Sequence, residues 1–190
     1  MVFLIIACNN TQNSPIIYSS KPNQDCVENY NKDVDYFPDK AVINYAKGFS
    51  VEYQNNYKIV TVKNPWQNAK TNFQYVLVEC GTPAPLGFQE TQLITVPINT
   101  IASLSTTHLP HLAFLGVVDK LVGVSNPKIV NTIEVVEKIK AGKIVELGNN
   151  DVNVERLLEL NPDLITTYGT GNPQTDNYPK LLEAGLKVAI

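Results

Sequence analysis

The chain has 190 residues and a net charge of −3, from 15 Lys and Arg against 18 Asp and Glu. Hydrophobic residues make up 44% of it and charged residues 17%, which excludes a disordered chain and predicts a surface rich in uncharged polar groups. The parts before and after residue 90 carry charges of −1 and −2, so neither is basic enough to wrap nucleic acid. No apolar run reaches the ~18–20 residues that span a bilayer.

The first residues are typical of the end of a secretion signal. Residues 4–8, Leu-Ile-Ile-Ala-Cys, resemble a bacterial lipobox, in which the cysteine is lipidated and becomes the mature N-terminus. We therefore expect residues 1–8 to be a signal remnant, Cys8 to carry lipid, and the protein to be exported and membrane-anchored. The basic start of a signal is missing, so Met1 is interpreted as an internal start or the edge of a fragment. A buried first strand is the alternative.

A polar stretch follows. Residues 9–35 are rich in Asn, Ser, Gln and Asp, and we expect a flexible tether over 9–38. Cys26 and Cys80 form an even pair once Cys8 is set aside, and an oxidising compartment permits a disulfide between them. The sequence does not show whether they lie within bonding distance, and it contains no C-x-x-C motif.

From residue 39 we expect one α/β lobe. Alternating β-rich runs at 49–53, 58–62 and 73–78 predict an antiparallel meander within residues 48–80, with Trp66 packed at its edge. Over residues 92–190, strands expected at 93–96, 100–104, 121–124, 143–147, 164–168 and 186–190 alternate with helices expected at 108–115, 131–140, 154–160 and 178–184. This order predicts βαβ units and a mostly parallel sheet with flanking helices.

Ligands bind at the carboxyl ends of the strands in such sheets. The loops to consider are therefore residues 105–108, 125–128, 148–150 and 169–177, which are rich in neutral hydrogen-bonding side chains.

Motifs of enzyme chemistry are weak. The Gly-x-Gly of residues 169–171 lacks the third glycine of a dinucleotide loop, and Pro173 removes an amide. No Walker A or G-x-S-x-G sequence occurs. The two histidines, His108 and His111, share a helix face but have no visible third metal ligand, so no metal site is predicted. His108 is placed so that it can touch a ligand, and His111 is interpreted as structural.

Several pieces together resemble the first lobe of bacterial ABC-transporter substrate-binding proteins for iron complexes, haem and cobalamin. They are residues 101–108, Leu115-Gly116, residues 121–125, the Asn-x-Glu-x-x-x-x-Leu-x-Pro-Asp-Leu-Ile stretch at 153–165, and residues 185–189. The resemblance implies two α/β lobes joined by a helix, with a C-terminal lobe missing here. It also implies no catalysis and no cofactor, a ferric or other metal complex as ligand, and an ABC permease with its ATPase as partner.

The resemblance also implies site residues. Ligand contacts fall on residues that follow the strands of the lobe: Thr106, Thr107, His108, Ser125, Asn126, Lys128, Asn149, Asn150, Tyr168 and Thr170. Of three positions that are often aromatic in cobalamin-binding relatives, only Tyr168 is aromatic here, which argues against a corrin ligand. These loops carry no arginine, so an anionic siderophore would depend on Lys128 or on the other lobe. Glu155 falls on the acidic position that docks onto the permease.

Two alternatives remain open. One is an enzyme of Rossmann or flavodoxin type, and the other is a surface sensor or adhesin that reuses the binding-protein fold. Turnover of a bound molecule distinguishes the first from a binding protein, and a neighbouring permease and ATPase argue against the second.

Overall fold

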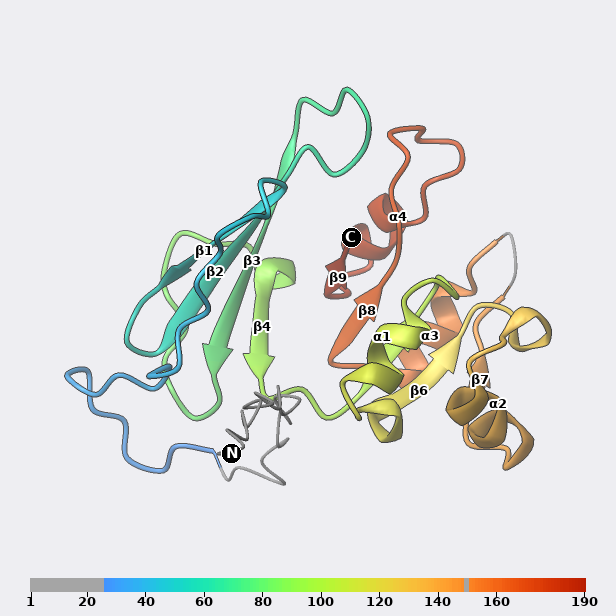
Figure 1. Ribbon diagram of the computed structural model, residues 1–190, viewed down its shortest axis with the longest axis horizontal. Coiled ribbons are helices and arrows are strands. Elements are labelled where there is room, and N and C mark those ends of the chain that lie inside the picture. Colours follow the sequence, from blue (N-terminus) through green and yellow to red (C-terminus); the bar gives the residue numbers. More distant parts are fainter. Residues whose placement is uncertain (1–25, 149–150) are drawn as a thin grey trace, which may run out of the picture.

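The computed structural model describes residues 26–148 and 151–190. Its strands fall into two sheets that lie side by side (Figure 1). The first sheet contains β1 (Phe49–Tyr53), β2 (Tyr57–Lys63), β3 (Asn72–Glu79) and β4 (Leu93–Val96). The second contains β5 (Ile101–Ser103), β6 (Leu121–Val124), β7 (Val145–Glu146), β8 (Leu164–Thr166) and β9 (Val188–Ala189). The helices are α1 (Leu109–Phe114), α2 (Ile133–Lys140), α3 (Val154–Leu160) and α4 (Tyr178–Glu183).

The first sheet confirms the predicted meander and adds one strand to it. β1, β2 and β3 are antiparallel neighbours. β4 then pairs in parallel with β3, Leu77 opposite Ile94. The sequence pattern groups this strand with the βαβ units of residues 92–190, and that grouping is wrong. Alternation along a sequence identifies a strand but does not identify its neighbour.

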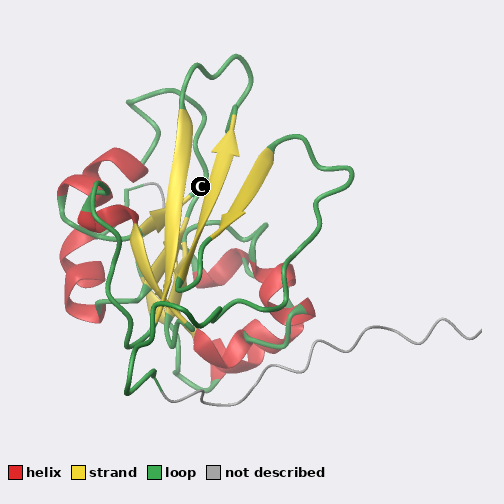
Figure 2. Ribbon diagram, turned by 90° about the vertical axis from the view of Figure 1, so that its left-hand side faces the viewer, coloured by secondary structure: helices red, strands yellow, loops and turns green. Residues whose placement is uncertain are grey.

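The second sheet is parallel throughout, with strand order β7-β6-β5-β8-β9. All three residues of β5 are buried, as expected for a central strand that is covered on both faces. Ala102 packs in a core with Leu157 of α3 and Leu181 of α4. Ile101 packs in another core with residues of α1 and α2. Figure 2 shows helices on both sides of the strands, so the predicted α/β class is confirmed.

Local sequence explains where the helices begin and end. The Asn153 side chain accepts a hydrogen bond from the Arg156 amide at 2.9 Å and so caps α3. Asn161 ends that helix in the left-handed conformation, with φ of 44°. Pro110 and Pro179 lie in the first turns of α1 and α4, where the missing N–H costs nothing. No helix in the described part of the chain is long and apolar enough to span a bilayer.

Residues 26–38 are attached to the first sheet, although their composition predicts a flexible tether. A disulfide joins Cys26 to Cys80, with Cα atoms 4.9 Å apart. The Val27 amide donates to the Cys80 carbonyl at 3.0 Å, and the Tyr36 amide donates to the Asn55 carbonyl at 2.7 Å. Composition alone does not reveal such a crosslink, so the ordered lobe begins earlier than residue 39.

An aromatic cluster joins the two sheets. Trp66, in the β2–β3 loop, lies 6.0 Å from Phe73 and 6.1 Å from Tyr178 between ring centroids, and Phe73 lies 5.4 Å from Tyr178. The Ile190 amide also donates to the Tyr75 hydroxyl at 2.9 Å, and burial raises the pKa of that hydroxyl. Trp66 is therefore a packing residue, as predicted, and it packs against the second sheet's α4.

Candidate functional site

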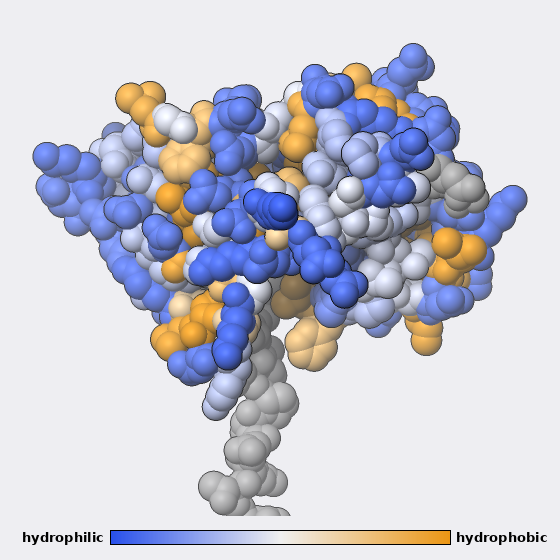
Figure 3. Space-filling view, turned by 90° about the horizontal axis from the view of Figure 1, so that it is seen from above, coloured by the Kyte–Doolittle hydropathy of each residue, from blue (hydrophilic) through white to orange (hydrophobic). Residues whose placement is uncertain are grey.

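A cleft opens where β5, β6 and β8 end. It encloses about 670 Å³, within the range of small-molecule sites, and we call it the strand-end cleft. Its lining residues come from the loops after those strands and from the loop before α4: Leu104, Ser105, Thr106, Ser125, Ile129, Asp151, Tyr168, residues 173–177 and Lys180. The face seen from above, toward which loop 169–177 projects, is mostly hydrophilic (Figure 3).

Hydroxyl groups fix the turn after β5 that leads into the cleft. The Thr166 hydroxyl donates to Ser103 Oγ at 3.1 Å, and Ser103 Oγ donates to the Ser105 carbonyl at 3.0 Å. Ser105 Oγ and Thr107 Oγ1 are 2.8 Å apart. Because Ser103 is buried, its two bonds satisfy a polar group that would otherwise be costly to bury. The backbone turn after β5 is thereby fixed.

Asp176 organises the loop on the other side. Its side chain is 7% exposed. One carboxylate oxygen accepts bonds from the Thr170 amide and hydroxyl, both at 2.8 Å. The other accepts the Gly171 amide at 2.8 Å. A buried carboxylate held by three donors is a rigid support, so loop 169–177 has a defined shape beside the cleft.

Trp66 braces this loop from the first sheet. A Cβ atom built on Gly169 would lie 2.8 Å from the Trp66 ring, and one built on Gly171 would lie 2.5 Å from Trp66 Nε1. Only glycine permits such close approach, and Gly171 also has a φ of +81°. The first sheet therefore takes part in positioning the cleft wall.

In addition to the Asp176 carboxylate, the cleft is lined by an ion pair. Lys180 Nζ of α4 contacts Asp151 Oδ1, which precedes α3. The hydrogen bond and the positive charge of Lys180 lower the pKa of the Asp151 carboxyl. Both side chains line the cleft, so Lys180 is a cation that sequence reasoning missed.

Tyr168 supplies an aromatic surface. It follows β8, lines the cleft, and is 51% exposed. An exposed ring beside neutral hydrogen-bonding groups is a stacking platform for a planar or ring-containing ligand.

A second hollow lies beside the cleft, between α1 and α2. It encloses about 490 Å³ and shares Thr106 and Ile129 with the cleft. We call it the α1–α2 groove. Its lining includes Thr107, Pro110 and Ile133, and Ile133 is 71% exposed.

The structure brings some of the predicted ligand residues together. Thr106, Ser125 and Tyr168 line the strand-end cleft, and Thr107 lines the adjoining groove. Three others have local roles. Asn126 accepts the Lys128 amide at 2.9 Å, Lys128 is exposed outside both hollows, and the Thr170 hydroxyl is bonded to Asp176. Asn149, Asn150 and Cys8 lie outside the described residues.

His108 lies just before α1 and lines neither hollow. Its Nδ1 atom is buried with no hydrogen-bond partner among the described residues. Burial, and next the nearby His111, lower the pKa of the His108 ring. The described residues contain no group of three or more His, Cys, Asp or Glu side chains able to hold a metal ion. Glu155 is exposed in the first turn of α3.

Asp176, Lys180, Asp151 and Trp66 were not among the predicted site residues. Two of them had a detectable signal. Asp176 lies near the end of a Gly- and Asn-rich loop that follows a strand, and Lys180 is the third residue of the next helix. Trp66 is about 100 residues away in the sequence, and only the three-dimensional fold shows its contact.

No family model matches the chain, and a search of curated proteins finds no match. Solved structures are similar over about half of it. The periplasmic vitamin B12 binding protein BtuF of Vibrio cholerae is 31% identical over 49% of this chain and 34% of its own, with a TM-score of 0.35. CeuE of Helicobacter pylori with Ni(II) bound is 26% identical over 50% of this chain and 31% of its own, with a TM-score of 0.39. The chain spans about a third of the length of either structure.

Proposed function

We propose that this chain is the first lobe of a substrate-binding protein of an ABC importer, and that it captures a metal complex for delivery to a membrane permease. The observation that carries the proposal is the strand-end cleft, where Thr106, Ser125 and Tyr168 meet at the ends of three parallel strands. The motif at residues 153–165, which resembles this family, forms the capped helix α3 and strand β8 of the same lobe.

Capture in this proposal needs no covalent step. Tyr168 offers its ring for stacking, while Thr106 and Ser125 offer hydrogen bonds without fixed charge. Asp176 and Trp66 keep loop 169–177 in place, so little conformational entropy is lost on binding. A second lobe, implied by the resemblance, would cover the ligand and exclude water. An iron–siderophore or haem complex has the ring and oxygen groups that suit these contacts.

Lys180 gives the cleft a preference within that class. Lys180 is the cation among the described residues that line the cleft. An anionic group of the ligand would compete with Asp151 for the Lys180 ammonium. Ferric catecholates and haem carry such groups, so we place them ahead of neutral complexes.

Export and a lipid anchor at Cys8 belong to the same proposal. The lipobox-like residues 4–8 support the anchor, and the Cys26–Cys80 disulfide supports an oxidising compartment. Cells that express the protein should incorporate labelled fatty acid into it, and Cys8→Ser should not be labelled. Equal labelling of the two would contradict the anchor.

Trp66 provides the binding test because it is the chain's one tryptophan and contacts loop 169–177. Haemin, a ferric catecholate, a ferric hydroxamate and cyanocobalamin are titrated against its fluorescence. We expect saturable quenching by haemin or the ferric catecholate, and recovery of the unchanged complex after release. Absence of quenching by all four, or conversion of a bound complex into product, would contradict the proposal.

Tyr168→Ala identifies the site of that binding. Loss of the ring should raise Kd by about tenfold, equivalent to about 1.4 kcal/mol. Tyr45→Ala is the matched control, because Tyr45 is 94% exposed and outside the cleft. Equal Kd values for the two variants would remove Tyr168 from the site.

A further inference from the structure

A separate cavity lies at the opposite end of the second sheet, beside the segment that connects the end of β4 to the start of β5. It encloses about 550 Å³ between residues 36–39, the end of β4 and the loop before β8. We call it the junction pocket. It shares no lining residue with the strand-end cleft, so a ligand there would be independent of the function proposed above.

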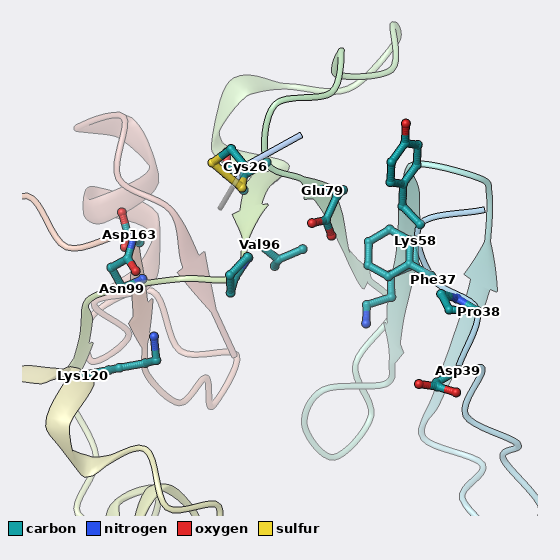
Figure 4. Close-up of a pocket in the computed structure, with 14 residues that line it drawn as sticks. Cys26, Phe37, Pro38, Asp39, Lys58, Glu79, Val96, Asn99, Lys120 and Asp163 are labelled. Carbon is teal, nitrogen blue, oxygen red and sulfur yellow. A yellow bond between two sulfur atoms is a disulfide. The ribbon is translucent and has the colours of Figure 1, made fainter. Parts of the chain in front are cut away.

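One wall of the junction pocket carries a positive and a negative side chain (Figure 4). Lys120 Nζ donates to the Ile98 carbonyl at 2.7 Å. Asp163 Oδ2 accepts the Asn99 and Thr100 amides at 2.7 and 2.9 Å. These bonds fix both groups but leave the lysine with further donors and Asp163 with its second oxygen. The wall is thus held in place before any ligand arrives.

The opposite wall also carries a lysine and carboxylate side chains. Lys58 Nζ lies over the Phe37 ring, 4.9 Å from its centroid, in a cation–π contact that holds the ammonium near the cavity. Asp39 and Glu79 add carboxylates on the same side (Figure 4). Glu79 is only 6% exposed, so it forms part of the buried side of this wall.

The remaining surface is apolar. Phe37, Val96 and Pro97 line the space together with the Cys26–Cys80 disulfide. The disulfide ties the start of the segment that carries Phe37 and Asp39 to the residue after β3, and so attaches this segment to the first sheet.

We propose that the junction pocket binds a small zwitterion, an α-amino acid with an apolar side chain. Lysines and carboxylates on both walls, with Lys120 and Asp163 held by the hydrogen bonds described above, complement a ligand that carries an ammonium and a carboxylate. In this arrangement Lys120 or Lys58 receives the carboxylate and Asp163 receives the ammonium. A ligand with only a positive charge leaves the lysine without a counter-charge, and a ligand with only a negative charge leaves Asp163 without one. Each therefore makes one of the two charged contacts that the zwitterion makes.

The test compares L-leucine with isopentylamine, which lacks the carboxylate, and isocaproate, which lacks the ammonium. Calorimetric titration of the disulfide-bonded protein should show saturable leucine binding, with each analogue at least about tenfold weaker. No heat from leucine at millimolar concentration, or an analogue that binds as tightly as leucine, would overturn the proposal.

Variants then assign the two charges. Lys120→Met should weaken leucine by about tenfold without weakening isopentylamine, and Asp163→Asn should weaken leucine without weakening isocaproate. In Asp163→Asn, the asparagine keeps an oxygen that can accept hydrogen bonds from the Asn99 and Thr100 amides. If Lys120→Met does not fold, Lys58→Met tests the lysine of the other wall. Lys140→Met is the control, since Lys140 is an exposed lysine at the end of α2. Leucine affinity unchanged in Lys120→Met, Lys58→Met and Asp163→Asn would also overturn the assignment.

Discussion

Buried polar side chains beside the strand-end cleft stabilise the loops that form it. Asp176 holds the Thr170 and Gly171 amides, and Ser103 joins Thr166 to the turn after β5. Replacing such a group leaves its partners unsatisfied, at a cost of about 1–3 kcal/mol. Mutations at these positions therefore alter the cleft through its shape before they alter any ligand contact.

His108 is a case where burial predicts a dependence on pH. Because burial lowers the pKa of its ring, the unfolded chain binds a proton more readily than the folded one near pH 6. The stability that the neutral ring contributes is present above its ordinary pKa of about 6.5. This contribution to stability is lost as the pH falls from the ordinary pKa through the lower pKa that His108 has in the folded protein.

Denaturant titrations from about pH 7.5 to about pH 5, a range that brackets the ordinary pKa, measure this effect. We expect the free energy of unfolding of the natural protein to decrease toward the acid end. In His108→Gln that decrease should be smaller, because the variant side chain does not titrate. His111→Gln removes only the smaller contribution to the lowered pKa of His108, so it should keep most of the decrease. A decrease of the same size in His108→Gln and in the natural protein would exclude His108 as the source.

Part of the candidate site could be predicted at this scale. Thr106 and Ser125 lie in loops that the strand-end rule selected, and Tyr168 was implied by the family resemblance; all three line the strand-end cleft. The same rule does not predict which side chains form hydrogen bonds within their own loop. Thr170 is bonded to Asp176, and Asn126 to the Lys128 amide, because local hydrogen bonds compete for polar groups in loops.

At the scale of elements, loop 169–177 depends on a contact between the two sheets. Gly171→Ala would place a methyl group 2.5 Å from Trp66 Nε1 at a φ of +81°. A left-handed φ alone costs an alanine about 1 kcal/mol. The added overlap with the ring should bring the loss of unfolding free energy to about 2–3 kcal/mol.

Gly142→Ala separates the two contributions. Gly142 has a φ of +68°, and no atom lies within 4 Å of the place that the added methyl group would take, so only the backbone cost of about 1 kcal/mol applies. Chemical denaturation of both variants, with Trp66 fluorescence as the signal, gives the comparison. Equal losses would show that Trp66 moves aside freely and does not brace the loop.

Most elements of the second sheet could be predicted from local pattern. Helix α3 has the predicted bounds 154–160, with Asn153 as its cap, because capping and amphipathic spacing are both local signals. β4 was assigned to the wrong sheet, since parallel pairing with β3 depends on a loop between them that carries no periodic signal. Residues 26–38 were misplaced because a disulfide over 54 residues is not a local feature.

At the scale of the whole molecule, that disulfide links the N-terminal segment to the first sheet. A crosslink that closes a loop of 54 residues restricts the unfolded chain and is worth about 4 kcal/mol in the loop-entropy model. We expect Cys26→Ser with Cys80→Ser to lower the free energy of unfolding by about 2–4 kcal/mol. Reduction of the natural protein should have a similar effect, and no change in either would show that the pair is not bonded in solution.

The outer face of α3 is where the proposed delivery step can be examined apart from ligand capture. Glu155 is exposed in the first turn of the helix and lines neither the cleft nor the groove. Glu155→Lys should therefore leave Kd for the bound complex unchanged. Its effect on stability should be small, about 0.5 kcal/mol from the lost interaction with the helix dipole.

Uptake of the radiolabelled metal complex by cells should nevertheless fall by at least about tenfold in Glu155→Lys, because a reversed charge repels the basic surface expected on the permease. Glu137→Lys is the matched charge reversal on α2, where Glu137 is also exposed, and uptake should remain near normal. A loss of both uptake and ligand affinity in Glu155→Lys would mean that the residue supports the fold. Normal uptake with normal affinity would mean that delivery does not use this face of α3.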